Sequence, residues 1–210
     1  MPRNKFPLKV ISMKEFIYLL VFSYFLGSFP TGYLISKIKG IDIRKVGSGA
    51  TGLTNVSRIL GWRWGIIVGF VDFLKGFISV LIALKLLKAA EWQIASVILM
   101  VIIGHVFPLW ISFRGGKGIA PLAGVLLGLL GGKIFLILFF LWLLLLLISR
   151  IMSITNLIFV LSLPFIFWFT FQSLTYLILG IILIGFIYWT HRENIKRIIE
   201  KREPGLNFKL

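Results

Sequence analysis

Several chemically versatile side chains are scarce in this sequence. Its 210 residues include no cysteine, only two histidines and only seven acidic residues. The absence of thiols excludes disulfides, thiolate metal sites and a cysteine acyl-enzyme. Two histidines are too few for a histidine-rich metal site, so we expect neither a bound metal nor another cofactor.

Polar residues of every kind are also too few to cover a water-soluble globule. Hydrophobic residues make up 59% of the chain and the mean hydropathy is +1.00, which is typical of an integral membrane protein. We predict an all-α fold with a single polytopic membrane domain over residues 1–210, because the polar segments are too short to fold alone. It comprises an N-terminal tail (1–15), a transmembrane bundle (16–190) and a cytoplasmic C-terminal segment (191–210). The first apolar run is too long for a cleaved signal peptide.

The formal net charge of +16 comes from 23 Lys and Arg residues. These cations lie mainly between the apolar runs rather than along one soluble face, so nucleic acid is not an expected partner. Anionic lipid headgroups and anionic substrates are the expected partners.

Apolar runs of about 20 residues are the unit of a membrane-spanning helix. The fourth such run is short and contains Pro121 and four glycines, which predicts a tilted, broken or partly re-entrant segment. The run 134–148, rich in Leu, Ile and Phe, is expected to carry no site. We place seven helices near residues 16–36, 65–87, 92–113, 118–131, 133–149, 154–171 and 173–190.

Seven crossings place the two termini on opposite sides of the membrane, and the distribution of cations selects the orientation. With the N-terminus outside and the C-terminus cytoplasmic, the cytoplasmic segments hold 15 cations, the outer segments hold 7 and Lys75 lies within a span. This topology brings four polar segments to the cytoplasmic face, where they can form one site: 37–64, 113–118, 149–153 and 191–194.

The stretch 40–61, GIDIRKVGSGATGLTNVSRILG, is the longest polar interruption between apolar runs. A glycine-rich turn exposes backbone N–H groups, and nearby Arg and Lys make it an anion nest suited to phosphate. Ser48 lies between Gly47 and Gly49 and can present its hydroxyl group to an oxyanion. A flexible turn is the alternative interpretation.

Within the same stretch, the letters TNVSR predict a helix start with Thr54 or Asn55 as the N-cap. Arg58 lies about one turn further along, so the helix N-terminus, the amide and the guanidinium can face one phosphate. Asp42 is better placed to orient Arg44 or Arg58 than to abstract a proton.

A second glycine-rich turn, RGGKG at 114–118, precedes the next span. It is not a Walker loop, because the GxxxxGK[ST] spacing is absent. Three glycines around Lys117 favour a backbone-lined anion site, with a basic membrane anchor as the alternative.

His105 is predicted to lie eight residues inside the third helix, about 12 Å from its cytoplasmic end. Pro108, one turn later, frees a backbone carbonyl and can open the helix toward a cavity. The roles of general base, substrate hydrogen-bond donor and structural brace all remain open for His105.

Three further polar features lie near the predicted site. Asp72 and Lys75, three residues apart, predict an intramembrane ion pair. Ser153 is typical of a helix cap, and the basic, amphipathic segment that begins at Arg192 is typical of a surface helix on anionic lipid.

Three long segments resemble, in order and spacing, the cytoplasmic motifs of the bacterial acyl-phosphate:glycerol-3-phosphate acyltransferase family. They are GSFPTGYLISKIKGIDIRKVGSGATGLTNVSRILG, GHVFPLWISFRGGKGIAP and HRENIKRIIEKREP. The letters DFLKG and the Arg150/Ser153 connection resemble the same family, and the resemblance runs from about Ser28 to Pro204.

This resemblance implies a seven-helix enzyme of the bacterial plasma (inner) membrane that needs no metal and has its active site on the cytoplasmic face. It implies transfer of a fatty acyl group from acyl-phosphate to the 1-hydroxyl of glycerol 3-phosphate, giving lysophosphatidic acid and phosphate. The implied partners are these two substrates, membrane lipids and a soluble enzyme that produces acyl-phosphate. The implied catalytic residues are Ser48, Arg58, His105, Lys117 and Asn194, and the implied substrate-binding residues are Thr54, Asn55, Gly47, Gly49, Gly115, Gly116, Ser153 and Glu193.

Two positions depart from the family pattern. Members commonly have Asn two residues after the motif serine and the letters GATN, whereas this chain has Ala50 and, in GLTN, Leu53. We expect backbone groups or water to replace the amide hydrogen bonds lost at Ala50.

The implied chemistry needs no protein nucleophile, because acyl-phosphate is already an activated mixed anhydride. Positioning and electrostatic stabilisation can supply the catalysis, with His105 or the phosphate of glycerol 3-phosphate as the base. A transporter or channel for a phosphorylated metabolite or anion is the alternative function, and a scaffold in a lipid-synthesis complex is a third. Transport predicts polar groups along a whole pathway, yet the last three predicted helices have almost none.

Overall fold

The computed structural model describes residues 11–86 and 89–205, so positions 1–10 of the predicted N-terminal tail and 206–210 of the C-terminal segment lie outside it. All regular structure in these described ranges is helical, which confirms the all-α prediction. The elements are α1 (Met13–Ser28), α2 (Thr31–Ile38), η1 (Ile43–Lys45), α3 (Leu53–Leu60), α4 (Trp62–Leu81), the π-helical η2 (Ile82–Leu86), α5 (Glu91–Val106), η3 (Leu109–Ile111), α6 (Ile119–Ser149), α7 (Met152–Leu161), α8 (Leu163–Phe171), α9 (Leu174–Thr190) and α10 (Arg192–Ile199).

Five helical stretches are long and apolar enough to cross a membrane, and α9 with α10, bent by 63°, is a sixth candidate. The five stretches are Met13–Ile38, Trp62–Lys85, Glu91–Ile111, Ile119–Ser149 and Met152–Phe171. Their apolar character agrees with the predicted integral membrane fold, while the count by helix length is lower than the seven crossings predicted from the sequence.

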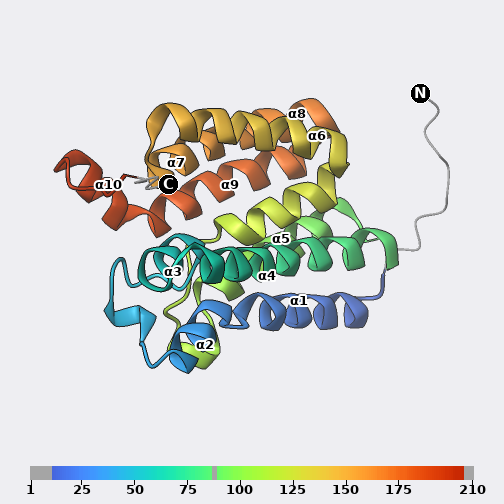
Figure 1. Cartoon of the computed structure of the whole chain (residues 1–210). Helices are drawn as coiled ribbons and strands as arrows, with labels where there is room; N and C mark the ends of the chain where they lie inside the picture. Colours follow the sequence, from blue (N-terminus) through green and yellow to red (C-terminus); the bar gives the residue numbers. More distant parts are fainter. Residues whose placement is uncertain (1–10, 87–88, 206–210) are drawn as a thin grey trace.

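Part of the difference in count lies in α9, which has only 17 residues, and the rest lies in α6, which joins the predicted fourth and fifth helices. Gly131 interrupts this element with φ 76° and ψ 168°, a conformation that side chains with a Cβ rarely adopt. Figure 1 shows the chain of α6 turning back on itself. Accordingly, a Cβ at Gly124 would lie 1.9 Å from the Phe73 carbonyl oxygen, while the Phe135 ring lies 5.9 Å from the Phe73 ring. A straight helix would separate residues 124 and 135 by about 16 Å.

Three of the predicted helices are divided in two or end early, and a proline lies at each of these breaks. The first run is divided into α1 and α2 before Thr31, where Pro30 cannot continue the backbone hydrogen-bond pattern. The third ends at Val106 instead of residue 113, because Phe107, which precedes Pro108, has a non-helical conformation. The sixth is divided into α7 and α8 next to Pro164.

Glycines allow the helices to approach each other closely. A Cβ on Gly27 of α1 would lie 2.2 Å from the Val101 carbonyl oxygen of α5, and a Cβ on Gly104 would lie 2.2 Å from the Tyr24 carbonyl oxygen. A Cβ on Gly76 of α4 would lie 1.9 Å from the Pro121 carbonyl oxygen of α6. Small residues at such crossings suit a membrane bundle, because lipid tails provide no hydrophobic force between helices.

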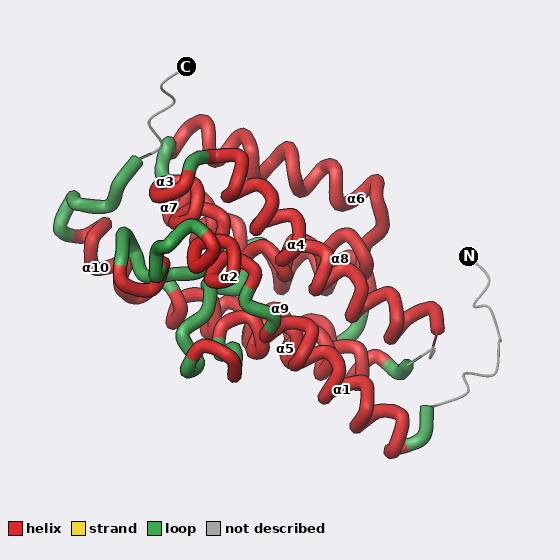
Figure 2. The backbone as a smooth tube through the Cα atoms, turned by 60° about the horizontal axis from the view of Figure 1, so that its bottom comes forward, coloured by secondary structure: helices red, strands yellow, loops and turns green. Residues whose placement is uncertain are grey.

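Polar segments that are distant in the sequence gather at one end of the bundle. In Figure 2 most of the loops lie around α2, α3, α7 and α10, at the same end of the long helices. The remaining connections near the opposite end are short. The gathered end is where the candidate site is found.

Candidate active site

A cavity of about 290 Å³ opens among α3, α4, α6, α7 and the C-terminal segment. Eight of the predicted site residues line it: Ser48, Thr54, Asn55, Arg58, His105, Lys117, Ser153 and Asn194. All four polar segments that were predicted to share one site therefore contribute residues to the lining of this cavity. Gly47, Gly49, Gly115, Gly116 and Glu193 do not line it.

The first loop is organised around the buried side chain of Asn55. Its Oδ1 accepts a hydrogen bond from the Ser48 backbone N–H at 2.9 Å, and its Nδ2 donates to the carbonyl oxygens of Val46 and Ala50, both at 3.0 Å. The predicted N-cap role of Thr54 or Asn55 is wrong, because α3 begins at Leu53 with Gly52 in the cap position.

The two glycines beside Ser48 shape this loop. Both have positive φ, 61° at Gly47 and 70° at Gly49, where glycine is strongly favoured. A Cβ at Gly47 would also lie 2.2 Å from the Oδ1 of Asn55. They therefore fix the backbone that presents Ser48.

Arg44 connects the first loop to η3, the short helix that precedes the second loop. Its Nε and Nη2 donate to the two carboxylate oxygens of Asp42 at 2.9 and 2.8 Å, and its Nη1 donates to the Ile111 carbonyl oxygen at 3.2 Å. The hydrogen bond from Arg44 lowers the pKa of Asp42 to about 2. Of the two partners predicted for Asp42, Arg44 is thus the one observed.

The second loop packs against the end of α5. The N–H groups of Gly115 and Gly116 donate to the carbonyl oxygens of Val106 and His105, each at 3.1 Å. A Cβ on Gly116 would lie 2.1 Å from the Nε2 of His105. The predicted backbone-lined anion site is wrong in this respect, since these two N–H groups already satisfy the last carbonyls of the helix.

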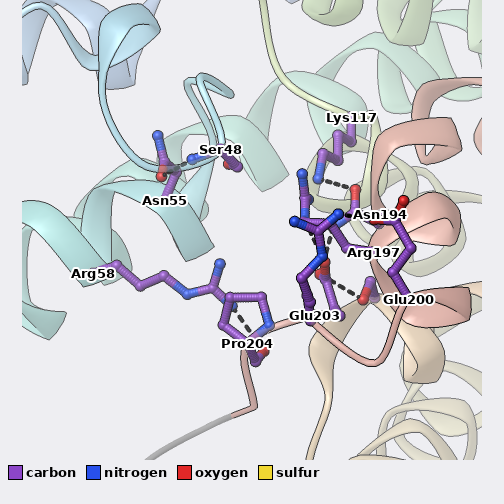
Figure 3. Close-up of polar contacts among 11 residues, drawn as sticks. Ser48, Asn55, Arg58, Lys117, Asn194, Arg197, Glu200, Glu203 and Pro204 are labelled. Atoms are coloured by element: carbon purple, nitrogen blue, oxygen red, sulfur yellow. Dashed lines mark hydrogen bonds and ion pairs between the residues drawn. The ribbon is translucent and has the colours of Figure 1, made fainter.

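Lys117 extends from this loop to the C-terminal segment, where its Nζ donates to the Oδ1 of Asn194 (Figure 3). Burial lowers the pKa of Lys117 to about 8, opposed by the nearby Glu203 carboxylate and assisted by the Arg197 and Arg58 cations. An incoming anion favours the charged form of such a lysine, so phosphate binding would raise the pKa of Lys117 again.

A buried polar cluster lies beneath the mouth of the cavity. Lys75 forms the predicted ion pair with Asp72 and also donates to the Phe29 carbonyl oxygen, which joins α4 to the break after α1. The Nδ1 of His105 lies 3.7 Å from Asp72, and Thr31 donates to the same carboxylate oxygen at 3.3 Å. His105 is in the last turn of α5, so the prediction that it lies about 12 Å inside the helix is wrong.

The sequence-based reasoning missed Glu203, whose side chain is only 3% exposed and lines the cavity. It accepts hydrogen bonds from Ser153 at 2.8 Å, Asn194 at 2.6 Å and Arg197 at 2.7 Å (Figure 3). Ser153 therefore donates a hydrogen bond to this carboxylate. It is not the predicted helix cap, because Ile151 is the N-cap residue of α7. The sequence did offer a signal for Glu203: it is one of only seven acidic residues and lies within the third segment that resembles the family.

His191 was also missed, although it is 2% exposed and lines the cavity. Its Nδ1 lies 2.9 Å from the Ile187 carbonyl oxygen, which assigns the proton to Nδ1 and leaves Nε2 as an acceptor. The sequence feature that could have indicated His191 is its position at the start of the same third segment, HRENIKRIIEKREP. Glu193, by contrast, is exposed and away from the cavity.

Arg58 and the C-terminal segment face each other across the mouth. The Arg58 guanidinium donates to the Pro204 carbonyl oxygen at 3.2 Å, and Figure 3 shows its side chain reaching from α3 toward that residue. Arg58 is exposed, whereas Lys117 is half-buried, so the cavity has one outer and one inner cation.

The other part of the cavity is apolar. Phe135, Leu138, Phe139 and Trp142, all from the second half of α6, line it together with Phe73 of α4. The expectation that the run 134–148 carries no site is therefore wrong. An anionic head group fits the cationic mouth. An apolar tail fits this apolar part of the cavity inside the bundle, which we call the apolar arm.

These features define a helical membrane protein with a cation-lined site for a molecule that carries an anionic head and an apolar chain. A family model described as "Glycerol-3-phosphate acyltransferase" matches residues 17–201. The chain belongs to this family.

Similar proteins of known name cover almost the whole chain. The glycerol-3-phosphate acyltransferase of Prochlorococcus marinus (strain NATL1A) is 41% identical over 193 residues, 90% of this chain and 96% of the relative. That of Aquifex aeolicus (strain VF5) is 39% identical over 188 residues, 89% of this chain and 97% of the relative. Neither match leaves a substantial part of the relative uncovered.

Two crystal structures of PlsY (YgiH), an integral membrane glycerol 3-phosphate acyltransferase, have the same fold. The glycerol 3-phosphate form has a TM-score of 0.86 at 36% identity, and the lysophosphatidic acid form has 0.83 at 35% identity. Each match covers 92% of this chain and 96% of the other.

Proposed function

We propose that this protein transfers a fatty acyl group from acyl-phosphate to the 1-hydroxyl of glycerol 3-phosphate, forming lysophosphatidic acid and inorganic phosphate. The observation that carries the proposal is that Arg58 and Lys117 line the same cavity as the apolar side chains of α4 and α6. Both substrates carry phosphate and the donor carries an apolar chain, so this combination suits them. The relatives' activity and the two ligand-bound PlsY forms support the same reading over transport.

The reaction is a direct acyl transfer. The glycerol 3-phosphate hydroxyl oxygen attacks the acyl carbonyl carbon, the new C–O ester bond forms, and the bond from that carbon to the phosphate oxygen breaks. The departing phosphate is stabilised by Arg58, Lys117 and the Ser48 loop. We assign the hydroxyl proton to a phosphate oxygen of the substrates, and His105, which packs between Asp72 and Gly116, to the role of a brace.

Phosphate release by the purified protein in detergent tests this function. We expect phosphate release from acyl-phosphate only when glycerol 3-phosphate is present, and no release of free CoA thiol when acyl-CoA replaces acyl-phosphate as the donor. Arg58→Ala and Lys117→Ala should each lower the rate by about a hundredfold or raise the KM steeply. Uptake of glycerol 3-phosphate into proteoliposomes without chemical change would instead establish the transporter.

We infer that the chain is one membrane domain that crosses a bacterial plasma (inner) membrane seven times, with a cytoplasmic site. The crossings are the α1–α2 pair, α4, α5, the two halves of α6, the α7–α8 pair and α9, with the N-terminus outside. The cysteine-free sequence allows a direct test. A cysteine at Lys133 should react with an impermeant maleimide in intact cells, and one at Lys201 only after lysis. The reverse pattern would overturn the orientation.

We further infer that a soluble enzyme on the cytoplasmic side supplies the acyl-phosphate. The exposed cations Lys196, Lys201 and Arg202 offer it an electrostatic contact at the site's edge. Adding a purified acyl-phosphate-forming enzyme should raise the coupled rate beyond that of free acyl-phosphate at low salt. An unchanged rate would remove this partner.

A further inference from the structure

One polar pair lies on the wall of the apolar arm and has no role in the reaction as described above. The Trp142 indole Nε1 donates a hydrogen bond to the Asn156 Oδ1 at 2.9 Å, and both side chains line the cavity. An indole N–H can only donate, so it must face the amide oxygen of Asn156. Trp142 thereby fixes the orientation of the carboxamide and leaves Nδ2 as its free donor group.

The location of Asn156 makes this donor unusual. It is 6% exposed and belongs to α7, within a stretch apolar enough to span the membrane. A buried carboxamide in that environment is costly unless its groups are hydrogen-bonded. Among the residues that the structure describes, Nδ2 has no hydrogen-bond acceptor, and it is not one of the fully enclosed unpartnered atoms, so it keeps accessible surface. Because Asn156 lines the cavity, we infer that Nδ2 faces its open space.

The depth of Asn156 suggests what it meets there. It follows Ser153 by three residues on α7, which places it on the same face and about 4.5 Å further from the mouth. Ser153 contacts Glu203 at the polar end, while Phe159, three residues beyond Asn156, lines the apolar arm. Asn156 therefore lies at the boundary between the two, where the carbonyl of an acyl-phosphate would fall.

We propose that Asn156 is a catalytic residue that donates its Nδ2 hydrogen bond to the carbonyl oxygen of the acyl donor, and that Trp142 is its positioning residue. This inference rests on the proposed acyl transfer. As the hydroxyl oxygen adds to the carbonyl carbon, negative charge develops on the carbonyl oxygen and strengthens the hydrogen bond. The carboxamide neither gains nor loses a proton, and the charge leaves with the phosphate when the carbon–oxygen bond breaks.

Kinetic measurements on purified variants test the assignment. We expect Asn156→Leu to lower kcat by about 10²- to 10³-fold, as for the loss of an oxyanion donor, while the KM for glycerol 3-phosphate stays within about twofold. Trp142→Phe should cause a smaller loss, about two- to tenfold, because only part of the amide population then points its donor into the cavity. Trp168→Phe is the matched control, since its side chain is on α8, away from the cavity.

The double variant Asn156→Leu/Trp142→Phe separates catalysis from folding. Replacing both partners of a hydrogen bond by apolar groups leaves no unpaired donor, so its thermal stability should stay near that of the wild type. Its kcat should equal that of Asn156→Leu alone, because Trp142 acts only through the amide. Near-normal kcat in the double variant, with a wild type that releases phosphate normally, would overturn the inference and leave the acyltransferase intact. A wild type without glycerol 3-phosphate-dependent release would overturn the proposed function itself.

Discussion

The carboxamide of Asn55 and the backbone of Ser48 form one unit, with the Ser48 N–H donating to the Asn55 Oδ1 at 2.9 Å. The same side chain donates to the Val46 and Ala50 carbonyl oxygens. One buried amide thus replaces the regular backbone pairing that a glycine-rich loop lacks. The Ala50 carbonyl oxygen is satisfied in this way by a side-chain amide. Replacement of the missing amide at position 50 by backbone groups or water stays a prediction.

Asn55→Asp should disrupt this unit although it changes the side chain by one group. A carboxylate can accept from Ser48 but cannot donate, so it would face the Val46 and Ala50 carbonyls without a hydrogen bond. We expect activity to fall by about a hundredfold and the unfolding free energy by about 2–4 kcal/mol. Phosphate release and thermal unfolding measure the two effects. Ser57→Ala, on the same helix but off the cavity, should change neither, and an active Asn55→Asp enzyme would show that the loop does not need this amide.

The lowered pKa of Lys117 predicts a pH dependence of substrate binding. Burial lowers this pKa to about 8, so the free protein loses the cation as the pH rises through that value. Substrate phosphate is already fully ionised there, with a second pKa near 6. The KM for glycerol 3-phosphate should therefore rise between pH 7 and 9, approaching tenfold per pH unit above 8. Lys117→Arg keeps its charge and should remove the rise. A rise of equal size in this variant would assign the effect to another group.

The second loop predicts sharply different results for two glycine substitutions. In Gly116→Ala the new Cβ would lie 2.1 Å from the His105 Nε2, so the loop has to move away from α5. We expect at least a tenfold loss of activity, with a higher KM for acyl-phosphate, because Lys117 moves with the loop. Gly185→Ala, in α9, places its Cβ in open space and should leave the rate unchanged while raising stability by up to about 1 kcal/mol. Equal effects of the two changes would contradict this packing.

Glu203 predicts a link between the C-terminal segment and acid stability. Burial raises its pKa, but hydrogen bonds from Asn194, Arg197 and Ser153 outweigh burial, so the pKa lies below 4.5. A depressed carboxyl pKa contributes stability that is full above the unfolded value and is lost as the pH falls through the folded one. Glu203→Gln should lower the melting temperature at pH 7 and flatten its fall at acidic pH. Glu200→Gln, which affects only an exposed pair with Arg202, is the control and should preserve the wild-type profile.

Helix existence was easier to predict than helix ends. Hydropathy located all the long apolar elements, because a bilayer requires about 20 apolar residues per crossing. It placed the end of α5 seven residues too late, since Pro108 and Phe107 terminate the helix inside an apolar run that the bilayer alone would allow to continue. The chain reversal at Gly131 was anticipated as a break between two predicted helices, and a glycine with positive φ is a local signal.

Some site residues could be predicted from local sequence, while others depend on contacts that only the folded chain makes. Ser48, Arg58 and Lys117 were found because glycine-rich turns with nearby cations, set between long apolar runs, are a local pattern that the sequence shows directly. Glu203 and His191 were missed because their significance depends on partners brought together by folding. The opposite error concerned Gly115 and Gly116, whose N–H groups looked available for phosphate but bond to the end of α5.

The sequence by itself determined that this chain is a helical membrane protein, where its polar segments lie and which family it belongs to, since composition and local motifs carry that information. Only the tertiary structure decided which polar groups pair, which remain free and where the apolar arm runs. Lys117 and Asn194 are 77 positions apart, and Arg58 and Pro204 are 146 apart. A buried hydrogen bond depends on which segments pack together, and Trp142 leaves the Asn156 donor facing the cavity only because α6 folds back beside α7.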